Sequence, residues 1–130
     1  MESFPSRPFG TGVRHRPHYA VNILAAEQVE LAKRFAGCSS DKFAGLATRT
    51  TESGVPLIYG CSAWFECRIV ARYPGGDHLI LLGEVERFTR APENPQTLLF
   101  HRGHYYSSLP YSSNNLRLPS GMIPQLVVDL

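Results

Sequence analysis

The stretch AWFECRIVARYPGGDHLILLGEVER, residues Ala63–Arg87, carries the clearest strand pattern in the chain. Apolar residues occupy alternate positions from Ala63 to Ala71, and successive side chains of a strand point to opposite faces. The proline and two glycines within Tyr73–Asp77 predict a tight turn. The second half, His78–Val85, is apolar at both parities, which predicts burial on both faces. The stretch therefore predicts a β-hairpin, which needs further strands or a helix against it.

The flanking segments supply that cover. His18–Leu24 is predicted as a short strand, and Ala25–Ala36 as a helix, because its apolar residues fall at helical spacing. Gly37 is a residue type well suited to end it. Further short strands are predicted at Thr48–Thr51 and at Leu57–Ser62, the latter forming the start of the hairpin's first arm. The predicted fold class is mainly β with one short helix.

The 130 residues suffice for a single domain with a modest core. Residues 1–17 are rich in Pro, Gly, Ser and Arg without a sustained period, which predicts an irregular segment. The folded domain is predicted over residues 18–109. Residues 110–130 contain many Ser, Asn and Pro and are predicted to be a flexible extension.

Composition excludes several classes of protein. Thirteen basic and eleven acidic residues give a net charge of +2 without a basic stripe, so no nucleic-acid binding is predicted. No apolar run approaches the roughly 20 residues that span a membrane, and the first residues lack a signal-peptide pattern, which predicts a cytoplasmic protein. Three cysteines without a CxxC argue against a disulfide framework. Cys61 and Cys67 lie roughly 20 Å apart on an extended chain and are predicted to be buried thiols.

The sequence contains no GxSxG, HExxH or Walker motif, so it does not predict any of the catalytic centres that these motifs mark. His101 and His104 offer half of a metal site with no obvious third ligand, so no metal is predicted. Asp77-His78 at the predicted turn has two interpretations. It is either a turn residue followed by the first residue of a strand, or a polar pair at the mouth of a barrel, where small ligands bind.

The segment His101-Arg102-Gly103-x-Tyr105 also leaves two interpretations open. An arginine beside a glycine lets backbone and guanidinium approach a phosphate, and the tyrosine could stack on a planar ring. The alternative is a solvated loop with one tyrosine packed on the core. Four charged residues of the hairpin are predicted to form cross-strand pairs on a wet face rather than a carboxylate dyad. They are Glu66, Arg68, Glu84 and Glu86.

Several motifs, in order and with matching spacing, resemble the flavin reductase family over about Tyr19–Leu109. They are YAVNILAAEQVELAKRFAG, DKFAG, PLIYGCSAWFECRIV, GGDHLILLGEVE and LLFHRGHYYS. Members of this family are the small NAD(P)H-dependent components of two-component flavin monooxygenases. The resemblance implies a split β-barrel of Greek-key type, a homodimer, and FMN or FAD bound near the subunit interface.

The resemblance also implies which residues form the site. The family's GDH segment matches Gly76-Asp77-His78, which makes His78 the implied catalytic residue and Asp77 a cofactor-binding one. The HRGxY segment matches His101, Arg102, Gly103 and Tyr105, close to flavin and pyridine nucleotide. The DKF element places Lys42 and Phe43 at the border of the cofactor region. Hydride transfer from NADH or NADPH to flavin needs positioning more than acid–base groups, because the cofactors carry the reaction.

The family usually has a longer segment before the strand that begins at Tyr19. That segment holds the first barrel strands and the residues that bind the flavin phosphate, and the resemblance implies that this sequence lacks them. Fewer strands would leave sheet edges exposed and the core open. The implied function is NAD(P)H-dependent reduction of FMN or FAD for a partner monooxygenase. The alternative is a truncated, non-catalytic module for flavin binding or dimerisation.

Overall fold

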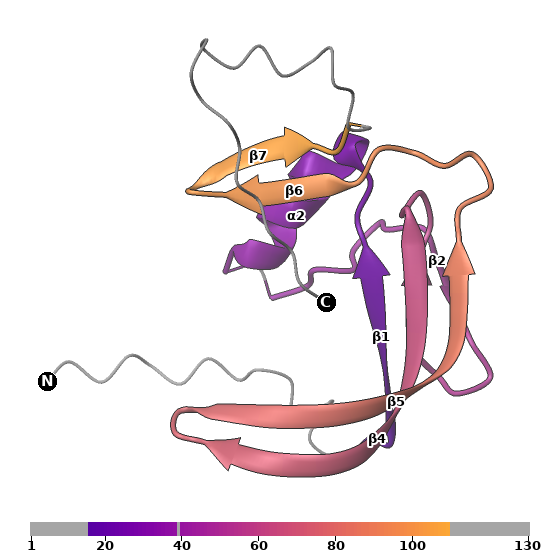
Figure 1. Cartoon of the computed structure of the whole chain (residues 1–130), viewed down its shortest axis with the longest axis vertical. Helices are drawn as coiled ribbons and strands as arrows, with labels where there is room; N and C mark the ends of the chain where they lie inside the picture. Colours follow the sequence, from indigo (N-terminus) through magenta and orange to yellow (C-terminus); the bar gives the residue numbers. More distant parts are fainter. Residues whose placement is uncertain (1–15, 39, 110–130) are drawn as a thin grey trace, which may run out of the picture.

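The computed structural model describes residues 16–38 and 40–109, which are mainly β with one helical segment, as predicted (Figure 1). The segments predicted to be irregular or flexible lie outside the described residues, apart from Arg16 and Pro17. The strands are β1 His18–Ile23, β2 Thr48–Thr50, β3 Pro56–Ile58, β4 Ala63–Gly75, β5 His78–Arg90, β6 Leu98–His101 and β7 His104–Ser107. The helical segment is a 3-10 turn, η1 Ala26–Gln28, followed by α2 Val29–Ala36.

Three antiparallel sheets contain these strands: β1-β4-β5, β2-β3 and β6-β7. The predicted hairpin is confirmed as β4–β5, but its turn is shorter than predicted. Gly75 pairs with His78, so only Gly76 and Asp77 lie between the strands, and Tyr73 belongs to β4. Gly76 has φ +67° and is the first of the two turn residues, the pattern of a type II′ hairpin turn.

The predicted burial of β5 on both faces is wrong. Leu79, Ile80 and Leu82 are 41%, 55% and 52% exposed. β5 is an edge strand, and β1 pairs with β4 only as far as Arg68. Beyond that point, β4 and β5 continue as a two-stranded ribbon that extends away from the rest of the sheet (Figure 1). Burial depends on which neighbours a strand finds, and the apolar composition of β5 does not reveal them.

The core lies where β3 and the first half of β4 meet β1. Leu57 and Ile58 of β3 are buried, and so are Cys61 and Cys67, which confirms the predicted buried thiols. The predicted continuation of Leu57–Ser62 into the hairpin is wrong. β3 ends at Ile58 and pairs with β2, and a turn through Gly60 at φ +85° separates it from β4.

Asn22 joins β1 to β3 through its side chain. Its Nδ2 donates to the Pro56 carbonyl at 3.3 Å, and its Oδ1 accepts from the Ile58 amide at 2.8 Å. The side-chain amide thus makes the pair of bonds that a backbone peptide of a neighbouring strand would make.

The charged residues of the hairpin form part of the predicted network. Arg68 bonds to Glu84 and, at 3.2 Å, to Glu86, which confirms these cross-strand pairs. Glu66 differs, because it is buried, with 8% of its surface exposed. Glu66 lies in the part of β4 that has a neighbour on each side, because it pairs with Ala20 of β1 and with Arg87 of β5.

Helix α2 ends at Ala36, as predicted. The Gly37 amide donates to the carbonyls of Lys33 and Arg34 at 3.0 and 3.2 Å, although Gly37 itself is extended with φ −77°. At the start of the segment, the Gln28 side chain accepts from the Ala25 amide and donates to the Tyr59 carbonyl, both at 2.9 Å. These bonds fix the helix against the connection between β3 and β4.

Candidate functional site

The predicted loop around Arg102 is a tight hairpin. β6 and β7 pair from Leu98↔Ser107 to His101↔His104, leaving a two-residue turn. Arg102 and Gly103 have φ +50° and +79°, the pattern of a type I′ turn, whose first position favours Asn, Asp or Gly. A left-handed conformation costs a residue with a Cβ about 1–2 kcal/mol, so the turn holds a strained arginine at an exposed tip.

Aromatic rings cover both faces of this short hairpin. Phe100 and Tyr105 pack with ring centroids 5.1 Å apart, and His101 lies 6.4 Å from Tyr106. The His104 Nδ1 lies 3.0 Å from the Arg102 carbonyl, and since a carbonyl only accepts, Nδ1 is the donor. The rings and this bond hold the turn in its strained conformation.

A cleft of about 420 Å³ lies between β1, α2 and the β6–β7 hairpin. Its walls include Ile23, Leu98, Phe100 and Tyr105, facing the helix at Ala32. Alanine recurs at Ala36, one turn later on the same helix face, and these small side chains leave room beneath β6. Size and apolar lining fit a small-molecule site. Two features of the sequence bear on this cleft: the helical spacing of the alanines, which by itself indicates a packing face, and Tyr105, for which stacking on a planar ring is one of the two interpretations.

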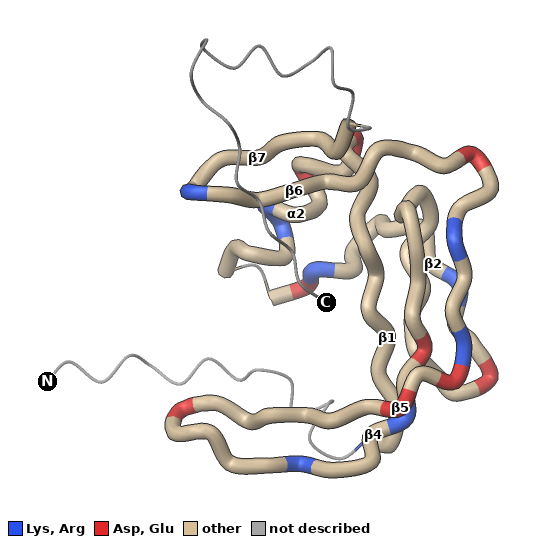
Figure 2. The backbone as a smooth tube through the Cα atoms, viewed as in Figure 1, with Lys and Arg blue, Asp and Glu red and all other residues tan. Residues whose placement is uncertain are grey.

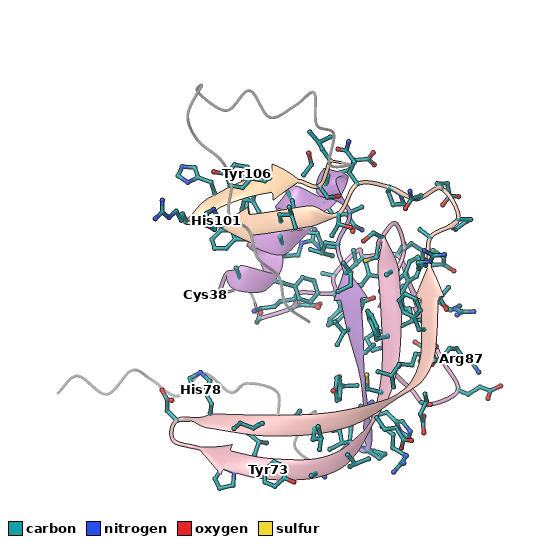
Figure 3. The ribbon with its side chains drawn as sticks, viewed as in Figure 1. Cys38, Tyr73, His78, Arg87, His101 and Tyr106 are labelled. Atoms are coloured by element: carbon teal, nitrogen blue, oxygen red, sulfur yellow. The ribbon has the colours of Figure 1, made fainter. Side chains whose placement is uncertain are left out.

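The tip of the β4–β5 ribbon carries Asp77 and His78. The His78 Nδ1 and Asp77 Oδ1 lie 2.5 Å apart, and the two side chains are 80% and 91% exposed. Figure 3 shows His78 at the end of the ribbon and His101 on the short hairpin, well separated on the same open side of the molecule. Tyr105 lines the cleft and His78 does not. The structure therefore does not bring the two predicted halves of the site together within one chain.

Residues 12–108 match the family described as "Flavin reductase like domain", which is most of the chain. The chain belongs to this family. The resemblance stated from the sequence motifs is confirmed.

Relatives in the flavin reductase family include reductase components of monooxygenases. The reductase subunit of a flavin-dependent monooxygenase from Mycobacterium tuberculosis is 39% identical over 88 residues, 67% of this chain and 47% of that protein. The reductase component of the flavin-dependent trigonelline monooxygenase from Acinetobacter baylyi is 39% identical over 110 residues, 85% of this chain and 35% of that protein. The chain thus spans about half the length of these curated relatives, or less.

A solved structure in the family is similar in fold as well. The NADH:FAD oxidoreductase of Streptomyces globisporus, in complex with NAD and FAD fragments, superposes with a TM-score of 0.68 at 40% identity. The match covers 75% of this chain and 59% of that one. The nitrilotriacetate monooxygenase component B homologue of Mycobacterium thermoresistibile gives a TM-score of 0.66 at 33% identity, over 85% of this chain and 60% of that one. The mainly β architecture is therefore that of flavin reductases.

Lys42 and Phe43, which the family motif places at the cofactor border, make contacts within the helix and its following loop. The Lys42 Nζ donates to the Phe35 carbonyl at 2.6 Å, near the end of α2, where a cation complements the helix dipole. Phe43 packs edge-on against Phe35 at 5.1 Å and remains 45% exposed. Their contact with a cofactor stays a prediction.

The buried Cys61 and the half-buried Tyr19 have perturbed acidities but stand apart from this chemistry. Burial raises the pKa of the Cys61 thiol, although a hydrogen bond with Gln28 lowers it in part. Burial also raises the pKa of Tyr19, and the neighbouring Cys67 adds to the rise. A thiol with a raised pKa is a poor nucleophile.

Across the residues that the structure describes, no three His, Cys, Asp or Glu side chains are grouped to hold a metal ion. No helix in that part of the chain is long and apolar enough to cross a membrane.

Proposed function

We propose that this chain catalyses NAD(P)H-dependent reduction of FMN or FAD and supplies the reduced flavin to a partner monooxygenase. The observation that carries the proposal is 39–40% identity to reductase components of monooxygenases and to an NADH:FAD oxidoreductase. The proposal includes a cytoplasmic location and a Greek-key split barrel that forms a homodimer, with flavin near the subunit interface. The half-exposed Val85 and Phe88 of β5 support it, because apolar side chains at a sheet edge call for further cover.

The residues present fit the implied cofactors at two points. The cleft beside Phe100 and Tyr105 has the size and apolar lining that a flat ring system requires. The guanidinium of Arg102 stands at an exposed turn, where it can pair with a phosphate in a bidentate manner. When bound, flavin and nicotinamide themselves supply the hydride chemistry.

The chain's own residues would then bind and orient. Tyr105 offers a ring face within the cleft, and Arg102, at the exposed turn of the same hairpin, would neutralise negative charge. His78 carries the imidazole that the proposal places beside the reacting rings, and Asp77 contacts it. His101 and Gly103 belong to the same tip as Arg102 and give the approaching cofactor an aromatic neighbour and an open backbone.

The test is oxidation of NADH or NADPH by the purified chain with FMN or FAD, followed by nicotinamide absorbance. Turnover above the background of free flavin with nicotinamide supports the proposal, and no excess contradicts it. Tyr105→Ala should weaken flavin binding by about tenfold, because stacking on a ring contributes on the order of 1 kcal/mol or more. Tyr106→Ala is the matched control, since this ring is 51% exposed and the cleft is lined by Tyr105 instead.

A second candidate, a non-catalytic flavin-binding or dimerisation module, is favoured by one observation. His78 lies far from His101 of the short hairpin (Figure 3), and it does not line the cleft to which Tyr105 contributes. This candidate predicts that flavin binds without turnover. A flavin fluorescence titration beside the turnover assay separates the two functions.

A further inference from the structure

The contact between Asp77 and His78 joins neighbouring residues, which is unusual in a β-structure. Successive side chains along a strand point to opposite faces, so adjacent residues seldom touch. Here Asp77 is the second turn residue and His78 the first residue of β5, and the change of direction between them brings Oδ1 within 2.5 Å of Nδ1. The contact is therefore a product of the two-residue turn.

The chemistry of the two groups fixes the donor. A carboxylate only accepts hydrogen bonds, so the bond requires the proton of the imidazole on Nδ1. In a neutral ring this leaves Nε2 as an acceptor, and the partner of one nitrogen thereby sets the state of the other. Both side chains are at least 80% exposed, and ion pairs at such exposure add little to stability.

We propose that Asp77 is a positioning residue that holds His78 in the Nδ1–H form, with Nε2 directed to an incoming cofactor. The consequence for turnover rests on the proposed reductase function, whereas the tautomer of His78 does not. An exposed imidazole without such a partner rotates and exchanges its proton between the two nitrogens. Asp77 therefore reduces the number of states from which a productive encounter begins.

The tautomer is measured directly by ¹⁵N–¹H correlation spectra of the histidine rings in the full chain, at a pH where the rings are neutral. The expected result is an Nδ1–H ring for His78 in the wild type and a mixture of tautomers in Asp77→Asn, whose amide can donate as well as accept. His104 is an internal control, because its Nδ1 donates to the Arg102 carbonyl and should not change.

Asp41→Asn is the matched control variant, since the Asp41 Oδ1 accepts from the Phe43 amide in a loop remote in sequence from the ribbon. It should leave the His78 spectrum unchanged. An Nε2–H ring in the wild type, or the same His78 pattern in wild type and Asp77→Asn, would overturn the proposal.

Turnover then tests the positioning role. Asp77→Asn should lower kcat about two- to fivefold, well below the roughly 10⁴-fold cost of a wrong tautomer in a buried triad, because water competes at this exposed tip. Asp77→Glu should recover part of the loss. Equal kcat in wild type and Asp77→Asn, despite a changed tautomer, contradicts the positioning role. Absence of turnover in the wild type counts against the proposed function alone, and the spectra still decide whether Asp77 orients His78.

Discussion

The two hairpins that carry the predicted site are built in opposite ways. β4 and β5 are 13 residues each, and β6 and β7 are four each. In the long hairpin only Gly76 of the turn has a positive φ, whereas Arg102 and Gly103 of the short one both do. Figure 2 shows an acidic residue at the tip of the long hairpin and a basic one at the tip of the short hairpin. From the sequence these are Asp77 and Arg102.

The difference indicates which contacts hold each hairpin, and so its tip, in position. The long ribbon is held at its base, where β1 pairs with β4 and the Tyr19 ring crosses Gly83 of β5. The short hairpin is held near its ends by the Leu98 amide, which donates to the Leu24 carbonyl at 2.9 Å, and its turn is held by the bond between His104 and the Arg102 carbonyl, against the strain of a positive φ at Arg102. Changes far from His78 should therefore affect the long hairpin most, and changes at Arg102 itself should affect the short one.

The largest expected effect tests the base of the long hairpin. A Cβ at Gly83 would overlap the Tyr19 hydroxyl and lie 2.7 Å from Cζ. Gly83→Ala should therefore lower the free energy of unfolding by about 1–3 kcal/mol, measured by urea denaturation. Gly75→Ala is the control. Its Cβ would meet the flexible end of Ile80 at 3.1 Å, and the loss should stay below about 1 kcal/mol. Equal losses of unfolding free energy in both variants would contradict the view that contacts at the base of the ribbon stabilise it more than contacts at its tip.

The next effect tests strain at the short turn. Arg102→Asn should raise the free energy of unfolding by about 0.5–1 kcal/mol, because asparagine tolerates the left-handed conformation. The same change should raise the KM for the pyridine nucleotide several-fold under the proposed function. Arg102→Lys keeps both the charge and the strain. It should therefore show a smaller change than Arg102→Asn in both the free energy of unfolding and the KM. A destabilised Arg102→Asn would show that the arginine, through contacts of its own, stabilises the turn.

A smaller effect is the pH dependence of the free energy of unfolding that Tyr19, whose ring crosses Gly83, contributes. Burial and Cys67 raise the pKa of Tyr19 in the folded chain above its ordinary value of 10.0. The unfolded chain therefore releases this proton first as pH rises, and the contribution of Tyr19 to stability falls above about pH 10. The stability difference between wild type and Tyr19→Phe should shift against the wild type between about pH 8 and about pH 11, as followed by urea midpoints. A constant difference across this range would contradict it.

The smallest effect concerns the surface ion pairs of the long hairpin. Glu84→Gln breaks a pair with Arg68 whose side chains are 46% and 59% exposed. The expected loss is below about 0.5 kcal/mol, and added salt should reduce it further. Glu93→Gln, in the exposed loop before β6, is the matched charge change. A loss of unfolding free energy above about 1 kcal/mol would mean that ion pairs stabilise the ribbon as well as packing does.

Local patterns predicted the central elements well. The alternation from Ala63 to Ala71 defines β4, and helical spacing with Gly37 marks the end of α2, because both depend on neighbours along the chain. Neither β6 nor β7 is among the predicted strands. A type I′ turn is usually recognised by Asn-Gly or Asp-Gly, and Arg102-Gly103 hides that signal.

What the sequence could not predict depends on neighbours in space. The half-exposed Ile80 lies beyond the point where β1 ends, and the buried Glu66 lies where β4 has β1 on one side and β5 on the other. The motifs predicted Tyr105 and His78 as site residues, but their separation follows from the length of the ribbon. The cleft required Ala32 to lie opposite β6, which no pattern in either segment indicates alone.

Asn22 makes the link between two of the sheets sensitive to a change of a single atom. Its amide presents a donor to Pro56 and an acceptor to Ile58 at the same time. Deamidation to aspartate would keep the shape and the acceptor but turn the donor into a second oxygen, which repels the Pro56 carbonyl. Slow chemical ageing at this position would therefore loosen β3 from β1 while leaving every backbone hydrogen bond of the two strands' own sheets in place.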